Sequence, residues 1–323
     1  MVRPRVVMFA FAPLLAASAV AAPQAGQPSQ TAAAPAARPF EALMPRVGAT
    51  APGTYVVDKA RFVPAPDAAR IPVMLQADVL RGPERAARVG IVVGADATQA
   101  VDVRLRVSTV ATGGEAARVV ADAGGSGTAG PMRLVREFSL PSGEYDLVAL
   151  VGHSKPGDQV VAVAKSRLTV PDIRGGSLTV TPIVAGEAAT ATAAPQANVP
   201  FIFGQTTLTP AVSPRVSQDG SISVAFRVYN WTAKAEEKPD LTVEYLFYEQ
   251  GTKGLHFFNK VKPQQLTADT LGTAFDASAG SVAAGMMIPM GAFTFGDFQL
   301  VVKVTDNRNK QSAEQQVRFT VAP

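Results

Sequence analysis

Apolar and polar residues alternate with a period of two along most of this 323-residue chain. The alternation is clearest over residues 101–107, 222–228 and 317–321. Successive side chains of a β-strand point to opposite faces, so each run directs one row of side chains into a core and the other into water. Turn residues such as Asp219-Gly220 separate the runs, and long amphipathic helical stretches do not occur. The pattern predicts an all-β fold built from antiparallel sheets.

The first residues have the composition of an export signal. Residues 1–21 combine a basic start at Arg3 and Arg5, an apolar stretch and the small-residue pattern Ala19-Val20-Ala21. This combination predicts a signal peptide, because the apolar stretch is shorter than the roughly 20 residues that a membrane span needs; an uncleaved anchor is the alternative. No later apolar run reaches spanning length, so we expect no transmembrane span in the mature chain. The expected location is periplasmic or secreted.

Two low-complexity stretches divide the rest of the chain. Residues 22–54 are rich in Ala, Pro and Gln, a composition that predicts a disordered linker. Residues 184–197, rich in Ala and Thr, predict a second linker. The remaining bodies, residues 55–183 and 198–323, each have the length and strand pattern of one β-sandwich. We therefore expect two Ig-like or fibronectin-III-like domains in tandem.

An internal repeat supports this organisation. The segment from Gly143 aligns with the segment from Gly296, and the segment from Arg167 aligns with that from Arg318. Each copy is expected to be the last hairpin of its domain, with Tyr145 or Phe298 closing the end of the sandwich. The Tyr145 hydroxyl is expected to bond a nearby backbone group, as in a tyrosine corner, whereas phenylalanine lacks that hydroxyl.

Some of these strand patterns are shared with a known group of proteins. Residues 140–147 (LPSGEYDL), 168–172 (LTVPD) and 178–180 (LTV) resemble the region that follows the von Willebrand A domain in exported acidobacterial VWFA-related proteins. Val228-Tyr229-Asn230 resembles a strand end of the same group. The resemblance implies a β module of the cell surface or periplasm without a defined activity. The A domain and its metal site are not part of the resemblance.

Composition removes several classes of function. The chain has no cysteine, which excludes disulfides, iron–sulfur clusters and thiol catalysis, and it has only two histidines. Without Arg3 and Arg5, the 30 basic residues become 28 against 26 acidic ones, and they are interspersed. A nucleic-acid partner is therefore not expected. We expect no cofactor, no metal site and no catalytic residues.

Several short motifs resemble active sites but lack the required context. Asp276 and Ser278 match the metal motif of A domains, yet too little chain follows for an α/β domain. Residues 125–130 match a nucleotide-binding glycine pattern but precede a strand-like run, so a hairpin loop is expected. His153 and His256 are expected to be ordinary loop residues, and residues 306–309 a hairpin turn.

One surface has the composition of a contact site. If the apolar row from Ile222 to Val228 faces the core, then Arg227, Tyr229 and Trp231 face outward. Tyr248 is expected to face outward by the same reasoning, with Tyr245 and Phe247 buried. Tyr, Trp and Arg are enriched at sites that contact protein partners or sugar rings. The alternative is that Trp231 folds back under a loop or against the first domain.

These observations give two hypotheses for function. The first is an exported, non-catalytic structural or protein-interaction module of the bacterial cell envelope. The second is a carbohydrate-binding or adhesive module that uses the aromatic face of the second domain. The expected partners are accordingly envelope proteins or polysaccharide.

Overall fold

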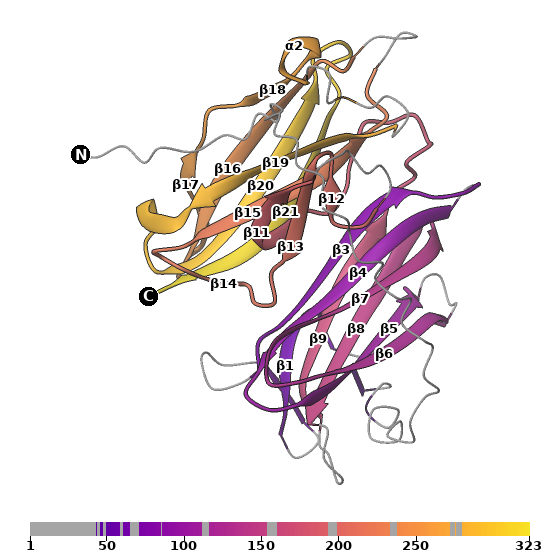
Figure 1. The fold of residues 1–323 in the computed structure, drawn as a ribbon, viewed down its shortest axis with the longest axis vertical. Coiled ribbons are helices and arrows are strands. Elements are labelled where there is room, and N and C mark those ends of the chain that lie inside the picture. The colour runs from indigo at the N-terminus through magenta and orange to yellow at the C-terminus, as the bar shows by residue number, and fades with distance from the viewer. Residues whose placement is uncertain are drawn as a thin grey trace, which may run out of the picture.

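The computed structural model describes residues 43, 46–47, 50–58, 61–64, 71–84, 86–111, 116–153, 160–192, 199–232, 238–271, 275 and 280–323. These residues are mostly β-strand and form four sheets (Figure 1). Neighbouring strands pair antiparallel except β14 and β21, which are parallel. The prediction of an all-β fold with antiparallel sheets is confirmed. The expected signal peptide, residues 1–21, lies outside the described residues.

The first half of the molecule contains two sheets. Sheet 1 has the strand order β2-β1-β9-β8-β5-β6, and sheet 2 has the order β3-β4-β7. The strands are β1 (Gly53–Asp58), β2 (Arg61–Pro64), β3 (Val73–Arg81), β4 (Ala86–Ala97), β5 (Val101–Thr109), β6 (Val119–Gly127), β7 (Gly130–Pro141), β8 (Gly143–His153) and β9 (Val160–Val170).

The second half contains the other two sheets. Sheet 3 has the order β10-β15-β11-β13-β12 with β19 beside β15, and sheet 4 has the order β14-β21-β20-β16-β17 with β18 beside β16. The strands are β10 (Thr179–Val180), β11 (Val184–Ala191), β12 (Ile202–Phe203), β13 (Thr206–Pro210), β14 (Arg215–Ser217), β15 (Ser221–Tyr229), β16 (Leu241–Gly251), β17 (Gly254–Lys260), β18 (Gln264–Leu266), β19 (Val282–Pro289), β20 (Gly296–Asp306) and β21 (Ser312–Ala322).

The helical elements of the described residues are short. The elements are α2 (Ala268–Leu271) and the 3-10 turn η3 (Met290–Ala292). Among the described residues, no helix has the length and apolar character needed to cross a membrane.

Apolar side chains form layers between the sheets. One core lies between sheets 1 and 2 and includes Ile91 and Leu105. A second lies between sheets 3 and 4 and includes Phe226 and Leu300. A smaller cluster, which includes Val92 of β4 and residues of four strands of sheet 3, joins sheet 2 to sheet 3. The sheets therefore follow one another in the order 1, 2, 3, 4, and the two middle sheets are covered on both faces at their strands β4 and β15.

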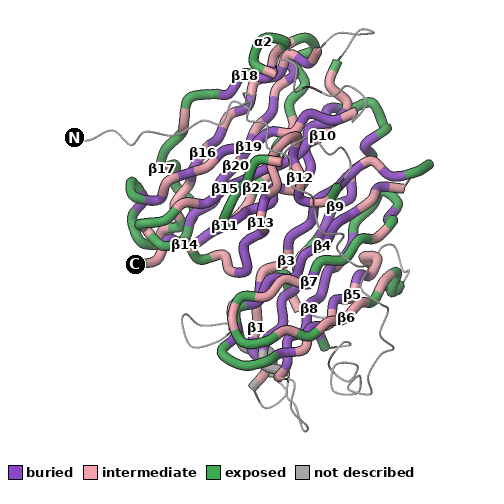
Figure 2. Tube along the Cα trace, in the orientation of Figure 1, coloured by how far each residue is buried: buried purple, intermediate pink, exposed green. Residues whose placement is uncertain are grey.

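The two middle strands show the effect of this layering on sequence. Residues 90–94 of β4 are all buried, and so are residues 222–229 of β15 (Figure 2). Gly90 and Gly94 allow the halves to approach, since a Cβ atom built on either glycine would lie 2.5 Å from Pro200 or Val212 respectively. Strict alternation with water on one face holds only for strands of the outer sheets.

The repeated hairpins have the same register in both halves. In β8–β9, Gly143 pairs with Val170; in β20–β21, Gly296 pairs with Val321. The Tyr145 hydroxyl donates a hydrogen bond of 2.9 Å to the carbonyl of Pro141, which confirms the expected tyrosine-corner contact.

The second copy of the repeat has an aromatic contact in place of that hydrogen bond. Phe298 is buried and stacks on Phe319, with ring centroids 5.7 Å apart. Each hairpin is the last of its half, as predicted.

The turn of the second hairpin is fixed by a buried carboxylate. Residues 306–311 connect β20 to β21, as predicted. Asp306 is 1% exposed and accepts hydrogen bonds from the backbone nitrogens of Thr232 (2.6 Å) and Arg308 (2.9 Å). Burial alone raises the pKa of Asp306, but these hydrogen bonds outweigh it and lower the pKa below its usual value.

Both predicted linkers are partly wrong. Within 184–197, residues 184–191 form β11, which pairs with β13 and β15. Residues 184–186 of β11 are buried between layers whereas residues 187–191 are exposed, and composition alone does not separate such a strand from a spacer. Within 22–54, β1 begins at Gly53, and the fully buried Val47 packs on Val148 of sheet 1. The connection between the halves is residues 171–178.

Candidate binding surface

The predicted aromatic face does not exist as one exposed surface. Arg227 and Tyr229 do lie opposite Phe226 and Val228, as the alternation predicts. They point into the first half, however, and are only 4% and 0% exposed. The expectation that both face solvent is wrong, because sheet 2 covers this side of β15. Tyr229 packs into the first core, and its hydroxyl donates to the carbonyl of Val79 at 3.3 Å.

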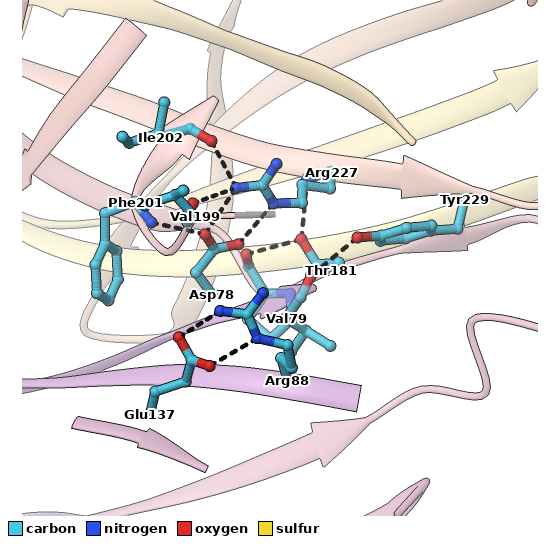
Figure 3. A network of polar contacts seen from close by, with 11 residues as sticks. Asp78, Val79, Arg88, Glu137, Thr181, Val199, Phe201, Ile202, Arg227 and Tyr229 are labelled. Atoms are coloured by element: carbon cyan, nitrogen blue, oxygen red, sulfur yellow. Dashed lines mark hydrogen bonds and ion pairs between the residues drawn. The ribbon is translucent and has the colours of Figure 1, made fainter. Parts of the chain in front are cut away.

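Arg227 forms a buried ion pair with Asp78 of β3 (Figure 3). Its Nε and one terminal nitrogen donate to the two Asp78 carboxylate oxygens at 3.0 and 2.9 Å. The same guanidinium donates to the carbonyl of Ile202 at 2.7 Å and lies over the ring of Phe203, 4.7 Å from its centroid. The pair is thus bidentate, with further hydrogen bonds from Arg227 to the backbone.

The electrostatics of this pair favour the charged form of Arg227. Burial alone lowers the pKa of Arg227, but the adjacent Asp78 carboxylate outweighs it and raises the pKa. Burial raises the pKa of Tyr229. Phe201 completes the site by donating its backbone N–H to Asp78 at 2.8 Å. The pair fixes the two halves to each other.

Gln76, on the same face of β3, forms a second polar contact between the halves. Its side-chain nitrogen donates to the carbonyls of Ala185 (2.9 Å) and Ala211 (3.0 Å), and its oxygen accepts from the Ala185 nitrogen at 2.6 Å. Gln76 is 6% exposed, so these bonds are shielded from water.

Trp231 folds back onto its own half. Asn230 adopts a positive φ of 57°, which ends the strand alternation directly after Tyr229. Trp231 then packs, half-buried, against the second core, with its ring edge-on to Phe275 at a centroid distance of 6.2 Å. Trp231 therefore folds back, which was the alternative to facing outward. It contacts its own half and not the first half.

Tyr248 is the only residue of the predicted set that lies on an outer sheet face. It pairs with Phe257 of β17 on one side and with Gln299 of β20 on the other, and Gln299 pairs with Arg318 of β21. Phe257 is 55% exposed and meets Tyr248 edge-on at 5.9 Å between ring centroids. These four side chains form a row across sheet 4, at right angles to its strands.

A second row runs beside the first. Leu255 of β17 pairs with Gln250 of β16, and Asp297 of β20 pairs with Thr320 of β21. Leu255 is 42% exposed. Along the edge strand β17 the two rows are apolar, and toward β21 they become polar. Most residues of β17 are exposed (Figure 2). We call this two-row surface the sheet-4 platform.

The platform contains a shallow pocket of about 270 Å³. Its lining includes Gln250, Leu255, Asp297, Gln299 and Arg318. The Asp297 carboxylate accepts a hydrogen bond from the Thr320 hydroxyl at 2.6 Å. The pocket therefore combines an apolar wall with a carboxylate, two amides and a guanidinium.

Arg318 is held differently from its counterpart in the first half. Arg167, at the equivalent position, donates to Asp146 at 2.9 Å and to Glu144 at 3.2 Å, and the hydrogen bond to Asp146 raises its pKa. At the position of Asp146 the second half has Gln299, whose oxygen accepts from the Arg318 Nε at 3.2 Å. Among the described residues Arg318 makes no ion pair, and its two terminal nitrogens have no hydrogen-bond partner.

Sequence reasoning did not find this platform, although its signal was in the repeat. The alignment of the two hairpins places Gln299 against Asp146 and Arg318 against Arg167. In this alignment the second half keeps the arginine but has a glutamine in place of the carboxylate of Asp146. The contribution of β17 needs the pairing of Tyr248 with Phe257, which the sequence does not specify.

The other candidate residues are not brought together. His153 ends β8, whereas His256 lies on β17 in the other half and bonds Glu249 at 3.1 Å. Asp276 and Ser278 lie outside the described residues. In the part of the chain that is described, no three His, Asp or Glu side chains are grouped so that they could hold a metal ion.

Comparisons with known proteins add no family. No family model and no curated protein matches the chain. Among solved structures, red sea bream transglutaminase is similar over 77% of this chain, with 11% sequence identity and a TM-score of 0.21. The chain spans 31% of the length of that protein.

Proposed function

We propose that this chain is an exported, non-catalytic binding module of the bacterial cell envelope, built from two Ig-like β-sandwiches that act as one rigid unit. The sheet-4 platform is its binding surface. The partner is an envelope protein or an envelope polysaccharide.

The observation that carries the proposal is the exposure of Leu255 and Phe257 on the same sheet face that carries the unpaired end of Arg318. Exposed apolar side chains with adjacent polar groups are typical of contact sites. The facing sheets in each half, and the last hairpin they share, support the Ig-like assignment. The likeness of residues 140–147 to exported VWFA-related proteins supports an envelope location.

A specific feature favours polysaccharide over protein. Phe257, Tyr248, Gln299 and Arg318 stand in one row, so an aromatic ring and hydrogen-bonding groups face the same ligand. Sugar rings pack on aromatic faces while their hydroxyls bond neighbouring amides and charges.

The test uses the full chain, immobilised, with solubilised envelope material passed over it before and after protease treatment. Retention is compared between the wild type and the double variant Tyr248→Ser, Phe257→Ser. Val135→Ser is the matched control, because Val135 is 43% exposed but lies on β7 in the first half.

The double variant is expected to lose retention and the control to keep it. Survival of retention after protease treatment identifies polysaccharide, and its loss identifies a protein. Equal retention by the double variant and the wild type, or no retention by any form, contradicts the proposal.

A further inference from the structure

The platform has a direction, because its apolar and charged ends lie on different strands. Phe257 on β17 and Arg318 on β21 are separated by three strand spacings, or about 14 Å. A ligand that touches both must lie across the strands. A peptide added to the free edge of β17 would instead run along the strand and would not reach Arg318.

The charged end donates hydrogen bonds. Both terminal nitrogens of Arg318 and the side-chain nitrogen of Gln299 lack a partner among the described residues. Gln299 is 7% exposed, so its amide is fixed in place by burial and by its bond to Arg318. A carboxylate matches such a group of donors.

The same pocket also offers an acceptor for hydroxyl groups. The Asp297 carboxylate is only partly satisfied by Thr320, because one hydroxyl donor leaves most of its lone pairs free. A ligand bearing both hydroxyls and a carboxylate satisfies Asp297 and Arg318 together. A purely acidic peptide would place its carboxylates near the carboxylate of Asp297, and the like charges would repel.

We infer that the sheet-4 platform binds an acidic oligosaccharide, with a sugar ring against Phe257 and a carboxylate at Arg318. This inference rests on the proposed function and names its ligand class. The first half has the same hairpin, but there Asp146 and Glu144 already occupy Arg167. The equivalent face of sheet 1 therefore does not bind the same ligand.

The probes are oligogalacturonate, its fully methyl-esterified form and poly-glutamate, titrated calorimetrically into the full chain at low ionic strength. The variants are Arg318→Gln and Phe257→Ser, with Arg167→Gln as the matched control at the equivalent position. Circular dichroism establishes that each variant is folded, which is expected because all three side chains are exposed.

Oligogalacturonate is expected to bind about tenfold more tightly than its methyl ester, since only the free acid forms a charge-assisted bond with Arg318. Arg318→Gln is expected to remove that tenfold preference, Phe257→Ser to weaken both probes, and Arg167→Gln to change neither. Equal binding of acid and ester, an unaltered affinity in Arg318→Gln, no binding of oligogalacturonate, or equally tight Arg318-dependent binding of poly-glutamate overturns the inference.

These failures differ from failure of the proposed function. If envelope material still requires Tyr248 and Phe257 for retention while oligogalacturonate does not bind, the binding module stands and the acidic ligand is wrong. If retention is also independent of these rings, both are wrong.

Discussion

The β8–β9 and β20–β21 hairpins share one backbone register but differ on both faces. On the inner face, Tyr145 bonds the Pro141 carbonyl, whereas Phe298 sits among aromatic rings. On the outer face, Arg167 is held by two carboxylates, and Arg318 only by Gln299. The same hairpin thus carries a paired arginine in the first half and an arginine with unpartnered hydrogen-bond donors in the second half. This difference is the reason why we propose the second half as the binding half.

The largest expected effect is on the free energy of unfolding. It tests whether the two halves unfold together or independently. Replacing Asp78 by Ala leaves Arg227 buried and unpaired, and it should lower the free energy of unfolding by about 3–5 kcal/mol. In the wild type, urea transitions followed by fluorescence of Trp231, the single tryptophan, and by far-UV circular dichroism should coincide. In the variant they should separate.

The control for this prediction is Glu137→Ala, which breaks the exposed pair of Arg88 and Glu137. Exposed pairs contribute about 0–1 kcal/mol, so this variant should unfold much like the wild type. If Asp78→Ala costs no more than Glu137→Ala, the buried pair does not couple the halves.

Exchanging the two aromatic residues tests the inner faces. Phe298→Tyr places a hydroxyl among the rings of Phe258, Phe293 and Phe319 and should cost about 1–3 kcal/mol. Tyr145→Phe loses one hydrogen bond and should cost about 1 kcal/mol. Thermal unfolding measures both. A neutral Phe298→Tyr would mean that the second half also accommodates a tyrosine corner.

The ends of the two hairpins carry different residues at equivalent positions. The residue equivalent to Asp306 is His153, whose Nδ1 is buried and lacks a partner among the described residues. The pKa of Asp306 is lower in the folded state than in the unfolded state, so its stabilisation is present above the unfolded pKa of about 3.9 and is lost as pH falls through the folded pKa.

The variant Asp306→Asn should therefore be destabilised by about 1–2 kcal/mol at pH 7, and its difference from the wild type should shrink below about pH 4. Urea midpoints measured from pH 7 to pH 3 give this difference. A constant difference across that range would show that the charge of Asp306 does not contribute.

The smallest effect concerns the outer faces. Arg167→Gln removes exposed ion pairs and should cost less than about 1 kcal/mol, and Arg318→Gln, which breaks no ion pair with a described residue, should cost still less. Differential scanning calorimetry compares them. A larger loss of stability in Arg318→Gln than in Arg167→Gln would contradict this expectation. It would mean that Arg318, rather than Arg167, stabilises the fold.

Local periodicity predicted the strands, the all-β class and the shared hairpin, because these depend on residues close in sequence. It also predicted that Arg227 and Tyr229 lie opposite Phe226. It did not predict that another sheet covers that side, since this depends on Asp78, far away in the chain. The alternation of the strand does not hold for Trp231, because Asn230 before it leaves the extended conformation. The small residues of β11 were assigned to a linker because composition does not record close packing.

The close contact of β4 with the second half has a consequence for binding. At Gly90 and Gly94 only a hydrogen atom separates one backbone from the residues opposite, so the angle between the halves cannot change without a clash or a gap. The sheet-4 platform is consequently presented in one direction relative to the first half. A partner that binds the proposed platform would not have to stop an interdomain motion, and preorganisation of this kind lowers the entropic cost of binding.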